Sequence, residues 1–534
     1  MFQQLLTPVG NHLALSALVA AVPVATVLWL LGVARRPAWQ ASLAGLLVTL
    51  AVAVLLWRMP LLLALNSAAA GAVFAVWPVM WIVFNALVLY NVAVLSGRFD
   101  AFRRWVIAHL PNDRRIVLVV IGYCFGSLLE GVCGFGTPVA ITSALLIALG
   151  FRPVDAVVYT VMFNTAPVAF GALGTPVTTL GAVTGYSDHL LGAMIGRQLP
   201  FFALLLPFYV IGIQGGWKSL RELWPVLLVA GLSFGLGQFV TSNFIGYELT
   251  DVVSSLFSLI ATVTFLRIWR RPANAAFVVD IVDPPEEAGR AVSPWQGWLP
   301  WLLVSAVVIV WTTLKFTLVG QVRLPWPGLD NAVLITAYDK PYAAVWTFQP
   351  LATGTAILVA ALVTAFAAGV GAQGYARALR ITWMQIRLAI LTVMLIIGMA
   401  YLMNYSGLTY TLGLAVASTG PVFPLVSAFL GWLAVFLSGS DTSGNALFGN
   451  LQVVAARQLG LDPVLFAATN SSGGVMGKMI SPQNISTGCA TTQLAGSEGA
   501  VFARTFKHSV ILTLLLGLLV VLQQYVLAWM IPRP

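Results

Sequence analysis

Two carboxylates in apolar, glycine-rich surroundings are the groups best suited to chemistry in this chain. Glu130 lies in the stretch SLLEGVCGFGTPVAITS and Asp441 in FLSGSDTSGNALFGN, and each is the only carboxylate of its stretch. A charged carboxylate at bilayer depth costs roughly 2.5–3.5 kcal/mol on insertion scales, so such a group is by default functional. The pair favours uptake and release of protons, or binding of a cation, over the alternative that one or both cap a helix near an interface.

A repeated spacing marks a second set of candidates. The pattern Asn-x6-Gly-x4-Pro occurs twice, in NTAPVAFGALGTP from Asn164 and in NSSGGVMGKMISP from Asn470. Each copy interrupts an apolar segment, because proline removes a backbone donor from the helix. Broken backbone at membrane depth belongs beside a cavity or ligand. Two breaks in corresponding positions of two halves indicate the substrate site of a transporter.

Lys478 is the only cation in the second of these apolar stretches. Three roles stay open for it: an ion pair with Asp441 or Glu130, snorkelling to the cytoplasmic interface, or binding of an anionic substrate. Helix N-termini and hydroxyl groups are also able to hold a carboxylate. The predicted substrate-binding residues, taken from the hairpin tips and the breaks, are Gly134, Phe135, Gly136, Thr137, Asn164, Thr165, Thr175, Thr442, Ser443, Asn445, Asn470, Ser471, Ser472, Lys478, Ser481 and Gln483.

Composition sets the class of protein. The chain has 534 residues, is 59% hydrophobic and only 8% charged, whereas a soluble protein carries about 25% charged residues. It is therefore expected to be an all-α polytopic membrane protein embedded in the lipid bilayer. The net charge of +10 is assigned to short basic loops rather than to a nucleic-acid surface.

Nothing in the sequence favours an enzyme. The three cysteines lack metal-ligand spacing, and there is no nucleotide-binding loop and no nucleophile with a histidine base nearby. No cofactor and no metal are predicted.

Basic residues also predict the topology. They mark the loops before 115, after 266, after 370 and after 494 as cytoplasmic. All four loops lie on the cytoplasmic side only if each of the segments 115–149 and 424–459 enters and leaves the membrane on the same side. The sequence thus predicts about twelve transmembrane helices plus two re-entrant hairpins, with both termini outside. The predicted helices lie near 12–34, 40–57, 74–96, 153–181, 188–213, 224–241, 248–266, 296–315, 350–370, 387–406, 463–490 and 508–530.

The order of elements predicts an inverted-topology repeat. In each half a hairpin precedes a broken helix, and the two hairpins insert from opposite faces. The first half is expected at 1–271, with hairpin 115–149 and broken helix 153–181. The second half is expected at 296–534, with hairpin 424–459 and broken helix 463–490. A polar cytoplasmic linker at 272–295 joins them, and 316–349 is expected to form an irregular external cap.

Four long runs carry a family likeness: EGVCGFGTPVAITSALLIALGF, NTAPVAFGALGTPV, FLGWLAVFLSGSDTSGNALFGNLQ and NSSGGVMGKMISPQNIS. They resemble the bacterial L-lactate permease family over most of the chain. The resemblance implies a secondary transporter of the bacterial cytoplasmic membrane that imports lactate, and in some members glycolate, together with protons. It also implies an ion-transporter-type fold in which hairpins and broken helices move against a scaffold that is often dimeric. Spans such as 12–57 and 224–315 are assigned to that scaffold, and a homodimer is among the expected partners.

The leading hypothesis is a proton-coupled importer of small 2-hydroxymonocarboxylates such as L-lactate, D-lactate and glycolate, with Glu130 or Asp441 carrying the proton. The nearest alternative is a sodium-coupled carboxylate symporter with oxygen ligands from the hairpin tips and from Asn164 or Asn470. An anion channel is a further alternative, which the paired breaks disfavour.

Overall fold

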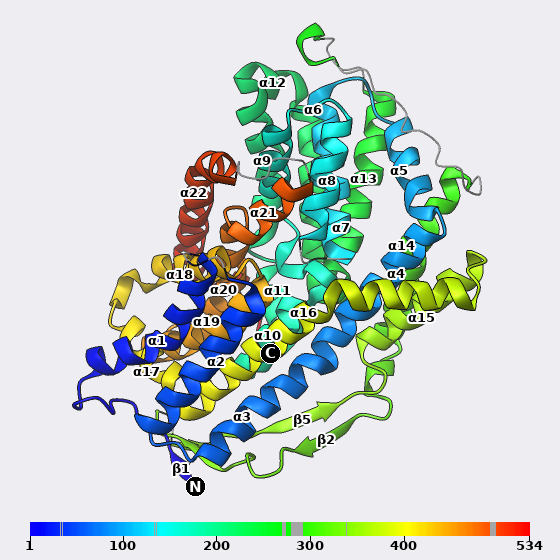
Figure 1. Ribbon diagram of the computed structural model, residues 1–534. Helices are drawn as coiled ribbons and strands as arrows, with labels where there is room; N and C mark the ends of the chain where they lie inside the picture. The colour runs from blue at the N-terminus through cyan, green and yellow to red at the C-terminus, as the bar shows by residue number, and fades with distance from the viewer. Residues whose placement is uncertain are drawn as a thin grey trace.

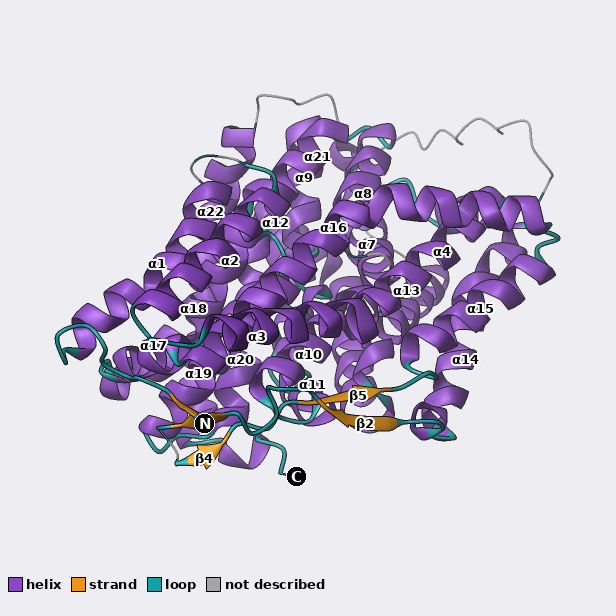
Figure 2. Cartoon of the chain, turned by 60° about the horizontal axis from the view of Figure 1, so that its bottom comes forward, coloured by secondary structure: helices purple, strands orange, loops and turns teal. Residues whose placement is uncertain are grey.

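The computed structural model describes residues 1–32, 34, 36–132, 134, 136–269, 274–278, 292–337, 339–491 and 498–533. These residues form a helical body with a few short strands at one end (Figures 1 and 2). We call this the strand end; it carries β1 (Phe2–Gln3), β2 (Val322–Pro325), β3 (Val333–Ile335), β4 (Lys340–Pro341) and β5 (Val345–Phe348). We call the opposite end, with α5 (Arg98–Ala108) and α6 (Arg114–Val117), the arginine end.

The described helices include nine that are long and apolar enough to cross a membrane, or eleven if each of two bent pairs counts as one span. The predicted number of about twelve remains a prediction. Large apolar side chains are exposed on the outer faces of these spans and of the shorter apolar helix Thr353–Ala367, for example Leu62 at 82% and Phe366 at 89%. Exposed apolar surface on this scale is typical of a lipid-facing wall. The outer helices include α1 (Leu13–Gly32), α2 (Ala38–Leu55), α14 (Leu299–Thr313), α15 (Thr353–Ala367) and α22 (Glu498–Tyr525).

The helix α12 (Leu199–Val240) is folded back on itself. Gly216 has φ +65° and ψ −169°, which breaks the helix. A Cβ placed on Gly231 would lie 2.6 Å from the carbonyl oxygen of Leu204, and one on Gly235 would lie 3.0 Å from that of Pro200. These contacts pair residues on either side of the break, so α12 is two antiparallel helices. They correspond to the two separate spans expected at 188–213 and 224–241, the first of which also contains α11 (Asp188–Ile195).

A long diagonal helix, α16 (Ala372–Ser406), packs against α3 (Leu61–Phe74) and α4 (Trp81–Leu95) (Figure 1). Gly398 allows the close approach, because a Cβ there would lie 2.9 Å from the carbonyl oxygen of Ala68. The helix begins at residue 372, whereas the apolar pattern predicts a helix only from 387 and a loop before it. Ala378, Thr382 and Ile386 are buried at helical spacing, and the segment has no proline, so the helix extends beyond the apolar stretch.

The segment 114–148 forms a helical hairpin. It runs through α6, a π-helical segment Leu118–Phe125, and α7 (Gly126–Val132), and returns as α8 (Thr137–Ala148). A Cβ on Gly126 would lie 3.3 Å from Thr142 Oγ1, so the two arms touch. The Arg114 guanidinium lies over the ring of Phe151, 5.7 Å from its centroid. Both ends of this first hairpin are therefore at the arginine end.

The segment 423–458 forms a second hairpin, from α18 (Phe423–Ser438) and α19 (Asp441–Gln458). Gly439 adopts φ +71° at the reversal, and Ser427 hydrogen-bonds Gln452 across the arms. At the far end of α19, Arg457 donates to the Tyr186 hydroxyl at 2.9 Å. Tyr186 follows α10 (Gly171–Thr184) and lines a cavity at the strand end, so the two hairpins enter the body from opposite ends.

Each hairpin is followed by an interrupted helix. α9 (Pro153–Phe163) and the segment Val168–Thr184, which contains α10, meet at 65°. Ala172, Leu173 and Gly174 have φ values of 45°, 54° and 78°. The second interruption separates α20 (Pro463–Lys478) from α21 (Pro482–Thr491). The helix α13 (Thr250–Ile268) packs against the first hairpin, and the assignment of 224–315 to a scaffold stays a prediction.

Residues 316–349 are more regular than the irregular cap expected from the sequence. β2 pairs antiparallel with β5, β3 pairs antiparallel with β4, and β1 from the N-terminus joins β3 in parallel. The β-branched valines of these strands favour extended backbone, and Pro325 stands at the end of β2. The expected linker 272–295 lies mostly outside the described residues. In its described part, Phe277 lies 4.2 Å under the Arg115 guanidinium.

Candidate functional site

An ion pair between the two halves of the chain lies at the centre of the site. Lys478 Nζ, at the last residue of α20, is 2.5 Å from Glu130 Oε1 in the last full turn of α7. The two side chains are only 7% and 2% exposed. Of the alternatives that the sequence leaves open for Lys478, the structure has the ion pair with Glu130.

The first Asn-x6-Gly motif surrounds this carboxylate. Asn164 Nδ2 donates to Glu130 Oε2 at 3.0 Å, so both carboxylate oxygens have a partner. A Cβ on Gly171 would lie 2.9 Å from Glu130 Oε1, which leaves no room for a side chain at that position. Asn164 and Gly171 therefore act on the same group, one as a donor and one by leaving space. Both belong to the interruption between α9 and α10.

Asp441 occupies a related but different pocket. It is the first residue of α19, and its Oδ2 accepts from Ser471 Oγ at 2.5 Å and from Asn445 Nδ2 at 3.4 Å. Its Oδ1 is buried and has no hydrogen-bond partner among the described residues, and it packs against Gly474. The donor is thus Ser471 rather than Asn470, so the second motif does not repeat the contacts of the first.

Asn470 instead holds the second hairpin to α20. Its Nδ2 donates to Asn445 Oδ1 at 2.9 Å and to the carbonyl of Gly444 at 3.2 Å. Its Oδ1 accepts from Gln452 Nε2 at 3.0 Å. Fully paired buried amides of this kind rigidify their surroundings. Asn470 therefore positions the neighbours of Asp441.

Both hairpin reversals lie against the second interruption. Gly136, with φ +81°, faces α21, where a Cβ would lie 3.5 Å from Thr487 Oγ1. A Cβ on Gly439 would lie 2.7 Å from Ser481 Oγ and 2.7 Å from Gln483 Oε1. Asn484 Nδ2 contacts the carbonyls of Lys478 and Gly439 at 3.3 and 3.5 Å. The structure thus brings both tips and the end of α20 together.

The remaining predicted residues divide by their partners. Thr165 and Thr175 donate to nearby carbonyls within the first interruption, at 2.7 and 2.6 Å. Ser472 and Ser481 are buried, and their hydroxyls have no partner among the described residues. Thr442 and Ser443 are buried in the first turn of α19. Gly134 turns the first tip with φ +57°. Phe135 and the side chain of Thr137 lie outside the described residues.

Asp251, the second residue of α13, is not among the residues predicted from the sequence. This residue is 1% exposed, and a Cβ on Gly131 would lie 2.7 Å from Asp251 Cβ. It therefore stands beside the Glu130–Lys478 pair. The signal that identifies Glu130, a carboxylate inside an apolar span, is also present in the predicted span 248–266.

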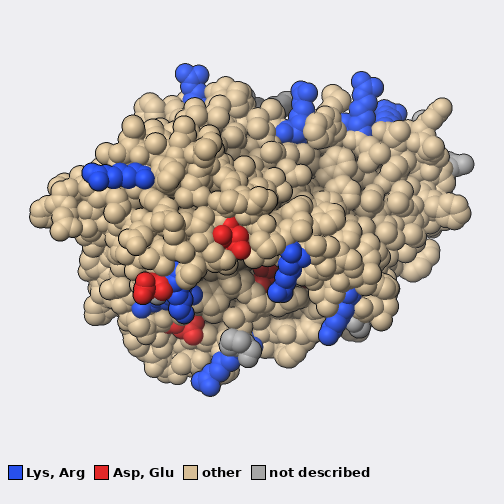
Figure 3. All heavy atoms as spheres, turned by 90° about the horizontal axis from the view of Figure 1, so that it is seen from below, with Lys and Arg blue, Asp and Glu red and all other residues tan. Residues whose placement is uncertain are grey.

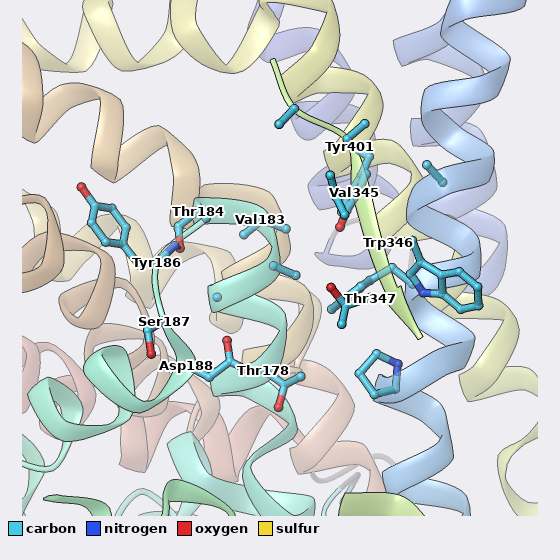
Figure 4. A pocket seen from close by; sticks show the side chains of 18 of the residues that line it. Thr178, Val183, Thr184, Tyr186, Ser187, Asp188, Val345, Trp346, Thr347 and Tyr401 are labelled. Atoms are coloured by element: carbon cyan, nitrogen blue, oxygen red, sulfur yellow. The ribbon is translucent and has the colours of Figure 1, made fainter. Parts of the chain in front are cut away.

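A cavity of about 880 Å³ opens between α10, α11 and the strands (Figure 4). Thr178 and Asp188 line it from one side and Trp346 and Thr347 of β5 from the other. The Tyr247 hydroxyl lies 3.0 Å from Thr178 Oγ1 and donates to Asp188 Oδ2 at 3.2 Å. Seen from the strand end, acidic and basic side chains are both exposed near the middle of this face (Figure 3). Thr178, Asp188 and Tyr247 form a polar part of the cavity lining.

This polar part of the lining lies close to the Asp441 pocket. Thr178 follows Pro176 by two residues, and the carbonyl of Pro176 accepts from Asn445 Nδ2 at 3.1 Å. Asn445 is also the donor to Asp441. The cavity therefore approaches the candidate site from the strand end.

Comparison with known proteins decides the family. The pattern of the family described as L-lactate permease matches residues 16–527. The chain belongs to the L-lactate permease family. It is 41% identical to the L-lactate permease of Bacillus subtilis (strain 168) over 99% of both chains. It is also 41% identical to the glycolate permease GlcA of Escherichia coli (strain K12), again over 99% of both chains.

Membership of the L-lactate permease family makes this chain a permease and not an enzyme. The family predicted from the four sequence runs is therefore confirmed. Among solved structures, the YdaH transporter of Alcanivorax borkumensis is similar to this L-lactate permease family member. The match covers 88% of this chain and 89% of the YdaH chain. The TM-score is 0.47 and the sequence identity 15%.

Proposed function

We propose that this protein is a secondary active transporter that imports L-lactate and related small 2-hydroxymonocarboxylates, including D-lactate and glycolate, together with protons. The substrate class is supported by the names of two relatives, an L-lactate permease and a glycolate permease, each 41% identical over nearly the whole chain. Lactate and glycolate share a carboxylate next to a hydroxyl-bearing carbon. The site should therefore recognise that unit and tolerate a hydrogen or a methyl group beside it.

One observation carries the mechanism: the buried ion pair of Lys478 and Glu130. A substrate carboxylate competes with Glu130 for the Lys478 ammonium. A buried charge that loses its partner is strongly destabilising, by about 3–5 kcal/mol. Glu130 therefore takes up a proton when the substrate replaces it, and one anion is moved with one proton.

Two buried hydroxyl groups, one in α20 and one just after it, suit the rest of the substrate. Ser472 and Ser481 are buried without hydrogen-bond partners in the described part of the chain, and buried polar groups are normally paired. A 2-hydroxycarboxylate offers both donors and acceptors for them. Asp441, with its unpartnered Oδ1, is the second candidate for a coupled proton.

We infer an alternating-access cycle in which the two hairpins and the two interrupted helices move as a unit. The inference is supported by hairpins that enter from opposite ends and by tips that meet at the end of α20. The proposal includes an inverted repeat, about twelve crossings of the bacterial cytoplasmic membrane, external termini and assembly as a homodimer. The cavity at the strand end would then face the outside in this conformation.

The test is transport by purified protein in liposomes that hold a pH-sensitive dye. An inward lactate gradient is expected to acidify the lumen, with saturation, competition by glycolate and no sodium requirement. Glu130→Gln should abolish acidification, whereas Ser418→Ala, at an exposed residue, should leave it unchanged. Acidification that is lost in Asp441→Asn but retained in Glu130→Gln would assign the coupled proton to Asp441 instead. Uptake that needs sodium would establish a sodium-coupled symporter instead. Flux that does not saturate would establish a channel.

A further inference from the structure

Asp251 is a buried carboxylate that the mechanism above does not use. It lies in the first turn of α13, is 1% exposed, and packs through its Cβ against Gly131, the residue that follows Glu130. Neither of its carboxylate oxygens has a hydrogen-bond partner among the described residues. Such a group is rare in a folded protein, because buried polar atoms are nearly always paired.

The charges around Asp251 make its position unusual. The titratable groups that act on it electrostatically are Glu130 from α7, Lys478 from α20 and Tyr123 from the first hairpin. Lys478 is already paired with Glu130, and the Tyr123 hydroxyl donates to the carbonyl of Ala203. On its own helix, Ser255 donates to the backbone carbonyl of Asp251 and not to its carboxylate. Asp251 therefore has a cation nearby but no donor of its own.

The number of charges around Lys478 determines whether Asp251 is ionised or protonated. If Glu130 and Asp251 were both ionised, one lysine would face two carboxylates, and the unpaired one would cost several kcal/mol at this depth. A proton on Asp251 removes that cost while the Glu130–Lys478 pair stays intact. In this conformation Asp251 is thus a neutral acid beside an ion pair.

We propose that Asp251 is the proton relay of this transporter, which supplies the proton that Glu130 takes up when a substrate anion draws Lys478 away. The inference rests on the proposed proton-coupled function. In the step, the O–H bond of Asp251 breaks and an O–H bond forms on Glu130. Lys478 passes from Glu130 to the substrate carboxylate. Asp251, now an anion, is reprotonated from the outside, so one proton enters for each substrate anion.

The return step restores the starting state. When the substrate leaves on the inner side, Lys478 pairs again with Glu130, which releases its proton inward. Asp251 keeps its own proton throughout this half of the cycle. Net movement of protons therefore requires Asp251, whereas exchange of one substrate anion for another, during which Glu130 keeps its proton, does not.

The experiment compares Asp251→Asn with wild type in liposomes. Asparagine matches the size of a protonated aspartate, so the variant should fold, with a melting temperature close to that of wild type. Lactate-driven acidification and pH-driven accumulation should fall at least tenfold, while counterflow exchange of labelled lactate stays within about twofold of wild type. Ser254→Ala, the matched control at another buried polar position of α13, should leave both activities unchanged.

The outcomes separate the two proposals. If wild type fails to couple lactate to protons, the proposed function is wrong. If wild type couples but Asp251→Asn still accumulates lactate, or loses exchange as well, the relay is wrong. An independent readout needs no functional variant: time-resolved infrared difference spectra of wild type after lactate binding should show the C=O stretch of one protonated carboxyl disappear as that of a second appears, before the first returns. Absence of that signal would also overturn the relay.

Discussion

Asn445 Nδ2, on α19 of the second hairpin, donates at 3.1 Å to the carbonyl oxygen of Pro176, in the interrupted helix of the other half. The same amide nitrogen lies 3.4 Å from Asp441 Oδ2. A shift of the first interruption therefore changes the environment of Asp441 directly. The two carboxylates that the sequence singles out are linked in this way, because Glu130 bonds Asn164 at the start of the same interruption.

The first prediction concerns the Glu130–Lys478 pair. Lys478→Met leaves the Glu130 carboxylate buried without its cation, so it should lower the unfolding free energy by about 3–5 kcal/mol. The double variant Glu130→Gln with Lys478→Met removes both charges and should recover most of that loss. Thermal unfolding in detergent measures both. Equal stability of the single and double variants would contradict a stabilising pair, and transport should be lost in each.

The second prediction tests the room beside Glu130. Gly171→Ala places a Cβ about 2.9 Å from Glu130 Oε1, so the carboxylate must move away from Lys478. Lactate uptake should fall by an order of magnitude or more, with the protein still folded. Gly499→Ala is the matched control, because nothing lies within 4 Å of a Cβ at that position. An active Gly171→Ala variant would show that the pair tolerates displacement.

These two sites show what the sequence does and does not determine. Glycine and proline place reversals and interruptions locally, so the stretches around Gly136, Gly439 and Pro176 are identifiable without a structure. The partner of Lys478 is not, because Glu130 and Asp441 are both plausible by chemistry. Only the packing of α20 against the first hairpin tip decides between them. Asp251 was missed because it lies in the first turn of an unbroken apolar helix, and the nearest glycine, Gly246, lies before that helix.

The extent of regular helices and strands is also only partly predictable from the sequence. The apolar run that predicts this helix begins near residue 387, yet α16 begins at residue 372. Arg377 and Arg380 are exposed and good helix formers, so the helix extends on the N-terminal side of the apolar run. Similarly, the strands of 316–349 depend on pairing with the distant N-terminal Phe2–Gln3. Contacts between residues so far apart in the chain do not appear in a local pattern.

The third prediction concerns the arginine end. Arg115 is fully buried and bonds Asp113 at 2.9 Å, Glu222 at 2.6 Å and Ser219 at 3.1 Å. Lysine has a single ammonium and cannot form all of these bonds. Arg115→Lys should therefore lower the unfolding free energy by about 1–3 kcal/mol for the donors lost. Thermal unfolding checks it, with exposed Arg380→Lys as control; an unchanged melting temperature would contradict the prediction.

The fourth prediction tests the Asp441 pocket. Ser471→Ala removes the 2.5 Å donor to Asp441 Oδ2 and leaves Asn445 as the remaining donor. The lost hydrogen bond to a carboxylate should cost about 1.5–3 kcal/mol. If Asp441 carries a coupled proton, this change should also shift the pH dependence of uptake. Thr469→Ala, two residues earlier on α20 and bonded to the carbonyl of Leu465 and to Gln198 rather than to Asp441, is the control. Identical pH profiles for wild type and Ser471→Ala would separate Asp441 from coupling.

The last prediction fixes which side the cavity faces. Ser187 is exposed at the strand end and lines the 880 Å³ cavity, whereas Arg377 is exposed near the start of α16. Arg98, at the arginine end, donates to the carbonyl of Ala367, the last residue of α15. The end of α15, and with it the start of α16, therefore lies at the arginine end. In a background without native cysteines, Ser187→Cys in intact cells should react with a membrane-impermeant maleimide, and saturating lactate should slow the reaction. Arg377→Cys should react only after permeabilisation. The reverse pattern would invert the proposed topology, while labelling of Ser187→Cys that lactate leaves unchanged would separate the cavity from the substrate path.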